Sequence, residues 1–280
     1  MTDPFSIPDS KNKPVNIEPA TTGKGSLELK TQVFMPTILI GLGGTGKEVL
    51  LRIRRQFVEK YGSLNDFPIT SYLYIDTDNA PPEESGIARN RDYLINEIDF
   101  KPSEKIFNPV NPADYIQRIS DLPHIKSWLN TTGEIGKLGT MNTGAGQIRP
   151  AARLALFHDF DEITQKLASA KSSITDSRSI NLVKEKHKIK NVNTEKINVY
   201  VITSVSGGTG SGMFIDFGFL VRHLFRNQAI SSGYVILPKI FQGYGKERVF
   251  ANGYAGLMEL EHYNLKNGFN VSWKKHEPQS

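Results

Sequence analysis

Four short apolar runs, at residues 35–40, 71–75, 200–205 and 234–237, alternate along the chain with longer segments of mixed polarity. Runs of this length that are bounded by turn residues are typical of buried β-strands. They are the strands that the sequence predicts.

The longer segments carry apolar residues at helical spacing. The clearest are residues 49–57, 213–225 and 249–265, in which apolar side chains recur every three or four positions. A shorter helix is expected over 151–157. Buried strands that alternate with amphipathic helices indicate an α/β fold, in which a parallel sheet has helices on both faces.

Two stretches do not fit this alternation. We interpret residues about 80–140 and about 165–197 as insertions that carry helices of their own. Residues 1–30 contain four prolines among polar residues and show no hydrophobic period, so we expect a flexible N-terminal tail. Residues 31–280 are then expected to form one domain.

The composition excludes several kinds of chemistry. The chain has 280 residues and no cysteine, which excludes disulfide scaffolds, zinc–thiolate sites and cysteine nucleophiles. No apolar run reaches the length of a membrane span, and the N-terminus carries prolines and aspartates where a secretion signal needs an apolar segment. These features predict a cytoplasmic protein without a membrane span.

The net charge of +5 comes mostly from one segment. Residues 171–196 hold seven basic and three acidic residues, and the run at 184–190 has no apolar face. We therefore expect 184–190 to be an exposed insert loop, and a docking patch for an acidic partner over 171–196 is the alternative. Nucleic-acid binding is not expected, because no aromatic residue is interleaved with the lysines.

The first glycine-rich loop, residues 41–47 (GLGGTGK), lies directly between the first predicted strand and the first predicted helix. Backbone N–H groups and the dipole at a helix start bind phosphate, and glycines let the anion approach them. The loop fits the Walker pattern up to Lys47, but Glu48 stands where Mg²⁺ coordination needs Ser or Thr. It also fits the Rossmann pattern GxGxxG, with Asp76 or Asp78 ending the next strand, and it fits a plain strand-to-helix turn.

The second loop, residues 206–212 (SGGTGSG), lies between the third predicted strand and its helix. Each glycine loses much backbone entropy when it is fixed on folding, and a turn without a ligand would not require so many of them. We expect the loop to help hold nucleotide phosphates between two helix N-termini, with hydroxyl donors from Thr209 and Ser211. A side chain at Gly208 is expected to occupy the phosphate position. A dehydrogenase has no use for such a second loop.

A third glycine-containing segment, residues 143–150 (TGAGQIRP), opens another predicted helix. Gly144 and Gly146 again expose the backbone. Arg149 or Arg153 is expected either to neutralise phosphate or to pair with a neighbouring carboxylate. The segment also fits a plain helix entry, since proline suits the first turn of a helix.

The three segments together resemble a known family. Residues 206–212 match the tubulin signature, in which Gly-Gly-Thr-Gly is flanked by small residues. The order of the loop at 41–47, the strand end at 76–78 and the segments at 144–146 and 206–212 resembles the nucleotide-binding loops of tubulin and of the bacterial division GTPase FtsZ. The resemblance covers roughly residues 34–265.

The resemblance implies a nucleotide-binding domain that takes GTP or GDP with Mg²⁺. Two stretches, 146–150 and 210–216, look like the bacterial tubulin-like branch rather than FtsZ itself. By this resemblance, Asp78 lies near the terminal phosphate and holds the metal, directly or through water, and Arg248 reaches the ribose and the phosphates. The residues that the resemblance assigns to nucleotide binding are Gly43, Gly44, Thr45, Asp78, Gly144, Ala145, Gly146, Gly207, Gly208, Thr209, Gly210, Ser211 and Arg248. The phosphate-loop pattern of the first segment adds Gly41, Gly46 and Lys47, although Lys47 departs from the FtsZ loop.

The same resemblance implies a filament-forming or interaction module that associates with itself or with a related subunit. In the family, a central helix grips the base, and the next subunit supplies acidic residues for hydrolysis. We expect the family's central helix and C-terminal domain to be absent from these 280 residues, so the catalytic residues stay unassigned and a GTPase would be active only on assembly. The alternatives are a nucleotide-gated scaffold without hydrolysis and a Rossmann NAD(P)-dependent oxidoreductase.

Overall fold

The computed structural model describes the following residues of the chain: 33–79, 95–241, 247–265 and 269–274. All of them belong to one compact unit, Gln32–Ser280. The predicted N-terminal tail, residues 1–30, lies outside the described residues.

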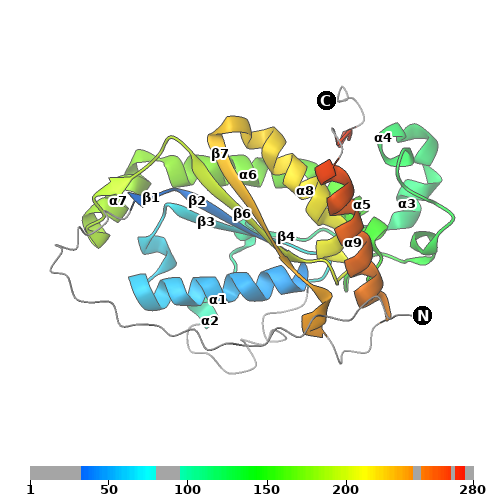
Figure 1. The fold of residues 1–280 in the computed structure, drawn as a ribbon, viewed down its shortest axis with the longest axis horizontal. Helices are drawn as coiled ribbons and strands as arrows, with labels where there is room; N and C mark the ends of the chain where they lie inside the picture. The colour runs from blue at the N-terminus through cyan, green and yellow to red at the C-terminus, as the bar shows by residue number, and fades with distance from the viewer. Residues whose placement is uncertain (1–32, 80–94, 242–246, 266–268, 275–280) are drawn as a thin grey trace, which may run out of the picture. The chain divides into compact units, whose positions relative to one another are not determined.

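A five-stranded sheet runs through the described residues in the order β4-β3-β2-β6-β7 (Figure 1). Its strands are β2 (Thr37–Leu42), β3 (Thr70–Ile75), β4 (Lys105–Ile106), β6 (Ile197–Ser204) and β7 (Ala229–Ile236). Every neighbouring pair is parallel. The parallel sheet and the four predicted strands are confirmed.

The central strand β2 aligns the ends of its two neighbours. Leu42 of β2 pairs with Ile75 of β3, and Gly41 pairs with Ile202 of β6. Because the strands are parallel, the loops that leave their carboxyl ends emerge at one edge of the sheet. This register places the segments after β2, β3 and β6 side by side.

Three strands of two residues were not predicted: β4 in the main sheet, and β1 (Val33–Phe34) and β5 (Asn191–Val192), which form a small parallel sheet of their own. Two residues are too short to show any alternation of apolar and polar positions. Only the three-dimensional pairing reveals such strands.

The α-helices of the described residues are α1 (Gly43–Tyr61), α2 (Ile95–Ile98), α3 (Pro112–Gln117), α4 (Pro123–Lys126), α5 (Arg149–His158), α6 (Phe160–Thr175), α7 (Ser177–His187), α8 (Thr209–Phe225) and α9 (Glu247–Leu265). Short 3₁₀ helices connect them: η1 (Leu64–Asp66), η4 (Pro102–Glu104), η5 (Ile119–Asp121), η6 (Glu134–Lys137), η7 (Arg226–Gln228) and η8 (Pro238–Phe241). The helices predicted over 49–57, 151–157, 213–225 and 249–265 correspond to α1, α5, α8 and α9.

Helices cover both faces of the sheet, as the alternation predicted (Figure 1). Ile38 and Ile40 of β2 belong to a large hydrophobic cluster with residues of α5, α6 and α8. Leu39 belongs to a second cluster, in which Leu50 and Leu51 of α1 are fully buried. Alternate residues of a strand point to opposite faces, so β2 connects the two layers.

The basic run at 184–190 was expected to be a loop, and this expectation is wrong for its first half. Helix α7 continues through His187. The Asp176 side chain caps the helix by accepting from the N–H of Arg178, and Val183 is fully buried. The cap, the buried Val183 and the contact of the His187 ring with Tyr61 and Phe67 dock this helix. Among the helices that the structure describes, none has the length and hydropathy needed to cross a bilayer.

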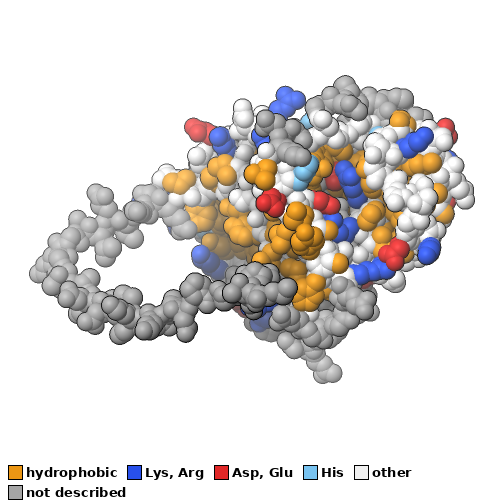
Figure 2. All heavy atoms as spheres, turned by 45° about the vertical axis from the view of Figure 1, so that its right-hand side comes forward, with side chains coloured by type: hydrophobic (Ala, Val, Ile, Leu, Met, Phe, Trp, Pro, Cys, Tyr) orange, Lys and Arg blue, Asp and Glu red, His pale blue; other side chains and the backbone are white. Residues whose placement is uncertain are grey.

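Helix α9 exposes one apolar face. Phe250, Tyr254 and Met258 follow one another at four-residue intervals, and they are 53%, 70% and 46% exposed. Figure 2 turns the α9 side of the molecule forward and shows hydrophobic side chains gathered on that face. An apolar stripe at helical spacing is a surface on which another polypeptide can pack.

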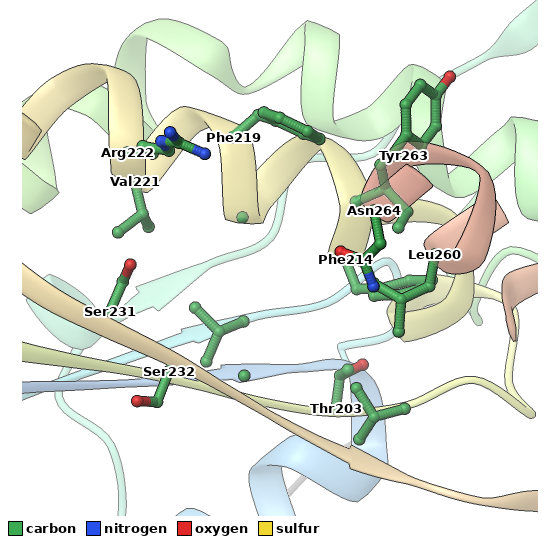
Figure 3. A pocket seen from close by; sticks show the side chains of 15 residues that line it. Thr203, Phe214, Phe219, Val221, Arg222, Ser231, Ser232, Leu260, Tyr263 and Asn264 are labelled. Carbon is green, nitrogen blue, oxygen red and sulfur yellow. The ribbon is translucent and has the colours of Figure 1, made fainter. Parts of the chain in front are cut away.

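Strand β7 forms one edge of the five-stranded sheet. Its sequence, AISSGYVI, contains no charged residue and no proline, and no described strand pairs with its outer side. A cavity of about 640 Å³ lies beside it, between α8 and α9 (Figure 3). Phe214, Phe219, Leu260 and Tyr263 line this cavity. The cavity lies between these helices and the sheet, and none of the residues that line it belongs to the glycine-rich loops.

Candidate functional site

The three glycine-rich segments converge at the carboxyl edge of β2, β3 and β6. A Cβ placed on Gly43 would lie 3.2 Å from the backbone nitrogen of Gly210, so the first and second loops are in contact. A Cβ on Gly208 would lie 3.0 Å from the Cα of Gln147, so the second loop also touches the third segment. The structure therefore brings together the segments from which the site was predicted.

Asp78 is joined to the third segment through the backbone. Asp78 forms an isolated antiparallel bridge with Thr143, and the N–H of Gly144 donates to the carbonyl oxygen of Thr77 over 3.0 Å. Gly144 has φ of +97°, and Gln147 has φ of +61°. Positive φ is natural for glycine and strained for Gln147, a feature that the sequence pattern did not reveal.

The helices that start at this edge, α1, α5 and α8, have no side-chain cap. Their N-cap residues, Leu42, Ile148 and Gly208, offer no side-chain acceptor to the first N–H groups. By contrast, α3 and α7 are capped by Asn111 and Asp176. First-turn N–H groups need acceptors, so three uncapped helix starts that converge form a donor surface suited to an anion.

The glycines of the loops fall into two groups. Gly44 and Gly207 border open space, because a Cβ on either would find no atom within 4 Å. Gly46 is enclosed, since a Cβ there would lie 2.7 Å from the carbonyl oxygen of Ile202. The enclosed glycines let the loops pack, whereas the open ones leave the backbone accessible to a ligand.

Gly208 belongs to the enclosed group, which corrects the expectation that a side chain there would fill the phosphate position. A Cβ on Gly208 would meet the backbone of Gln147 and would lie 3.1 Å from the Cβ of Ala145. The N-cap of α8 faces the third segment at this point. A substitution would therefore displace that segment before it reached open space.

The hydroxyl groups of Thr209 and Ser211 are used inside the protein, contrary to the expectation that they donate to phosphate. Thr209 Oγ1 donates to a carboxylate oxygen of Asp76 over 2.8 Å. Ser211 Oγ donates to the carbonyl oxygen of Gly207. These residues can therefore offer a ligand the backbone N–H groups of the first turn of α8 rather than their side chains.

The Lys47 side chain is buried between α1 and β3. It is 7% exposed, and its ammonium nitrogen lies 5.6 Å from the centre of the Tyr74 ring. At this distance the cation interacts with the ring face. The Lys47 side chain therefore packs against Tyr74 of β3.

Helix α9 contributes two polar side chains to the third segment. Arg248 donates to the carbonyl oxygen of Gly146 over 3.3 Å and pairs with Glu134 at 2.7 Å. Asn252 is 8% exposed, and its amide donates to the carbonyl oxygen of Gln147 over 3.0 Å. Sequence analysis identified Arg248 and missed Asn252. The signal available was the four-residue spacing, which puts both on one face of a helix.

Both arginines of α5 pair with carboxylates, which decides between the two predicted roles. Arg149 donates to Glu259 of α9 over 2.7 Å and to the carbonyl oxygen of Ser211 over 3.0 Å. Arg153 forms two hydrogen bonds to Asp216 of α8, of 2.8 and 3.0 Å. Burial raises the pKa of Asp216, and the adjacent Arg153 opposes that rise. These pairs fasten α5 and α9 to α8.

Replacing Arg153 by alanine should lower the free energy of unfolding by about 2–4 kcal/mol, because it leaves a buried carboxylate unpaired. Asp216 is 3% exposed, and the Arg153 guanidinium also lies 4.5 Å from the Trp128 ring. Urea unfolding of Arg153→Ala measures the loss. Adding Asp216→Asn to that variant should recover part of it, since the unpaired charge is removed. A loss below about 0.5 kcal/mol, typical of a surface substitution, would contradict this role of the pair.

The parallel sheet with helices on both faces, and with glycine-rich loops at its carboxyl edge, defines a doubly wound α/β domain. The sequence profile of the family described as "Tubulin like" matches residues 38–279. The chain therefore belongs to the tubulin-like family, and the resemblance predicted from the loops is confirmed. Its assignment to a bacterial branch stays a prediction.

Three solved structures are similar to this chain. CetZ from Methanosaeta thermophila is 15% identical with a TM-score of 0.45, over 81% of this chain and 42% of that chain. CetZ1 from Haloferax volcanii, a GDP-bound monomer, is 14% identical with a TM-score of 0.43, over 81% and 47%. CetZ2 from Haloferax volcanii, a GTPγS-bound protofilament, is 12% identical with a TM-score of 0.35, over 82% and 57%. The chain spans about half the length of these proteins, and no curated protein matches it.

Proposed function

We propose that this chain binds a guanine nucleotide, GTP or GDP, together with Mg²⁺, at the carboxyl edge of β2, β3 and β6. The observation that carries the proposal is the convergence of the uncapped starts of α1, α5 and α8 beside the open glycines Gly44 and Gly207. Phosphate is the ligand chemistry that such a surface fits. Membership of the tubulin-like family supports a guanine base.

An oxidoreductase that uses NAD(P) is the weaker candidate. A Rossmann site needs one glycine-rich loop at a helix start, together with an acidic residue for the ribose. The second glycine-rich loop and the family membership both argue for a nucleotide with its phosphates held between two helices.

We infer further that the protein works in the cytoplasm as a module that associates with itself or with a related subunit, and that hydrolysis is completed between subunits. The exposed apolar face of α9 supports this inference, because the same helix carries Arg248 and Asn252 to the third segment. A subunit that packs on the apolar face of α9 would therefore contact the helix whose opposite face carries these two side chains to the third segment. A nucleotide-gated scaffold without hydrolysis is the alternative.

The basic segment 171–196 is proposed to contact an acidic partner. Lys184, Lys188 and Lys190 are exposed on α7 and the residues that follow it, whereas Lys186 pairs with Asp66 at 2.7 Å. A cluster of exposed cations attracts acidic surfaces, and this attraction weakens with salt.

The nucleotide itself can be identified directly. The purified protein is denatured, and the released small molecules are identified by mass spectrometry. GDP or GTP is the expected result. Release of NAD or NADP would contradict the proposal and favour the oxidoreductase.

Asp78→Asn should weaken the binding of GTP more than that of GDP. If Asp78 holds the metal or its water at the terminal phosphate, the loss of charge affects mainly the nucleotide that has this phosphate. Calorimetric titration with each nucleotide in the presence of Mg²⁺ measures the difference. Equal losses for both would mark Asp78 as a structural residue that pairs with Thr143 at the end of β3.

A further inference from the structure

Asp76 is a buried carboxylate at the point where β3 meets the start of α8. It is 6% exposed. It accepts hydrogen bonds from the Tyr74 hydroxyl over 2.7 Å, from the Thr77 N–H over 2.8 Å and from the Thr209 hydroxyl over 2.8 Å. Tyr74 lies on β3 and Thr77 follows that strand, whereas Thr209 is the first residue of α8.

A chain of hydroxyl groups extends this connection. Thr77 Oγ1 lies 2.7 Å from Thr209 Oγ1. Because the Thr209 hydroxyl donates its hydrogen to Asp76, it accepts one from Thr77. Gly210, next to Thr209, is the residue that contacts Gly43 of the first loop. The position of the second loop relative to the first therefore depends on the bond between Asp76 and Thr209.

The charges around Asp76 are unevenly distributed. Asp78 lies near Asp76 at the end of β3. Lys47 of α1 lies over the ring of Tyr74, which donates to Asp76. From α8, the neutral hydroxyl of Thr209 contacts Asp76. Burial raises the pKa of Asp76, and its three donors oppose that rise. Removing the carboxylate would leave the Thr209 hydroxyl without its acceptor at the end of β3.

We propose that Asp76 is a positioning residue of the phosphate site: it holds the first turn of α8 through Thr209 and so places the backbone donors of that turn. The effect on phosphate binding rests on the proposed nucleotide binding. The effect on the position of α8 concerns the protein without a ligand.

Two substitutions test this role. Asp76→Ala removes the acceptor, so we expect faster amide hydrogen exchange at residues 208–211 in nucleotide-free protein and a loss of GDP affinity of about 100-fold, as for a misplaced binding group. Asp76→Asn keeps an acceptor of the same shape. We expect it to restore both the slow exchange and the GDP affinity to within about three-fold of the wild type, and failure of this rescue would overturn the role of the Thr209 bond. Tyr74→Phe is the matched control, since it removes one donor from β3 and leaves Thr209 bonded.

The two proposals fail in different ways. If the wild type binds neither GDP nor GTP, the proposed function is wrong, and the effect of Asp76 on nucleotide binding is wrong with it. Hydrogen exchange in the nucleotide-free protein then still decides the positioning role. Unchanged exchange at residues 208–211 in Asp76→Ala overturns that role whatever the nucleotide data show.

Discussion

Substitution of Gly44 by leucine is expected to abolish nucleotide binding while the protein stays folded. Gly44 lies in the first turn of α1, and no atom lies within 4 Å of a Cβ placed on it. A leucine there would project into the space from which a phosphate reaches the backbone N–H groups. Losing two charge-assisted hydrogen bonds at about 1.5–3 kcal/mol each corresponds to a loss of affinity of roughly 10²–10⁴-fold.

Two further glycines make the test specific. Gly218→Leu is the matched control, because Gly218 also lies in a helix, α8, and also borders open space, but it lines the cavity beside β7. It should leave the affinity for GDP unchanged. Gly46→Ala should lower the thermal stability, since its Cβ would meet the carbonyl oxygen of Ile202 at 2.7 Å. Full binding by Gly44→Leu would contradict the location of the site.

The second large effect concerns hydrolysis. We expect residues 1–280 alone to bind GTP and to hydrolyse it about 10²–10⁴-fold more slowly than the assembled protein, because in the proposed mechanism another subunit supplies the group that orients the attacking water. At the described loops, the carboxylate of Asp76 is occupied by three donors, and Glu134 pairs with Arg248. In the proposed mechanism, the acidic group comes from another subunit.

Phosphate release at increasing protein concentration tests this expectation. The rate per chain should be very low for this chain by itself and should rise with concentration when a longer form or a related subunit is present. Rapid hydrolysis that does not depend on concentration would contradict the shared site. It would also point to an acidic residue within the chain, and Asp78 and Asp76 would be the first to substitute.

Much of the fold could be predicted from sequence because its longer strands are short apolar runs, and because α1, α5 and α8 begin within glycine-containing segments. The most distinctive segment of the chain, residues 206–212, for example, lies where β6 has ended and α8 begins. Strands as short as β4 could not be predicted, because two residues show no period. The extension of α7 into the lysine-rich run depends on the buried contact of Val183, which the exposed lysines hide.

For the candidate site, the sequence predicted which segments converge but not which way their side chains point. Thr209 looked like a ligand for phosphate, yet its hydroxyl is bonded to Asp76, a residue 133 positions earlier. Asn252 went unnoticed because its partner, the Gln147 carbonyl, is a backbone group 105 positions away. Long-range hydrogen bonds of this kind leave no periodic pattern, so only the structure reveals them.

The open edge of β7 has a consequence for handling the isolated chain. An uncharged strand of eight residues without proline is a template for strand-to-strand aggregation, because nothing on it repels a second extended chain. Such aggregation would proceed equally with and without GTP. Assembly through the nucleotide site would instead respond to the nucleotide, so turbidity that GTP does not alter reports misassociation of β7 rather than filament growth.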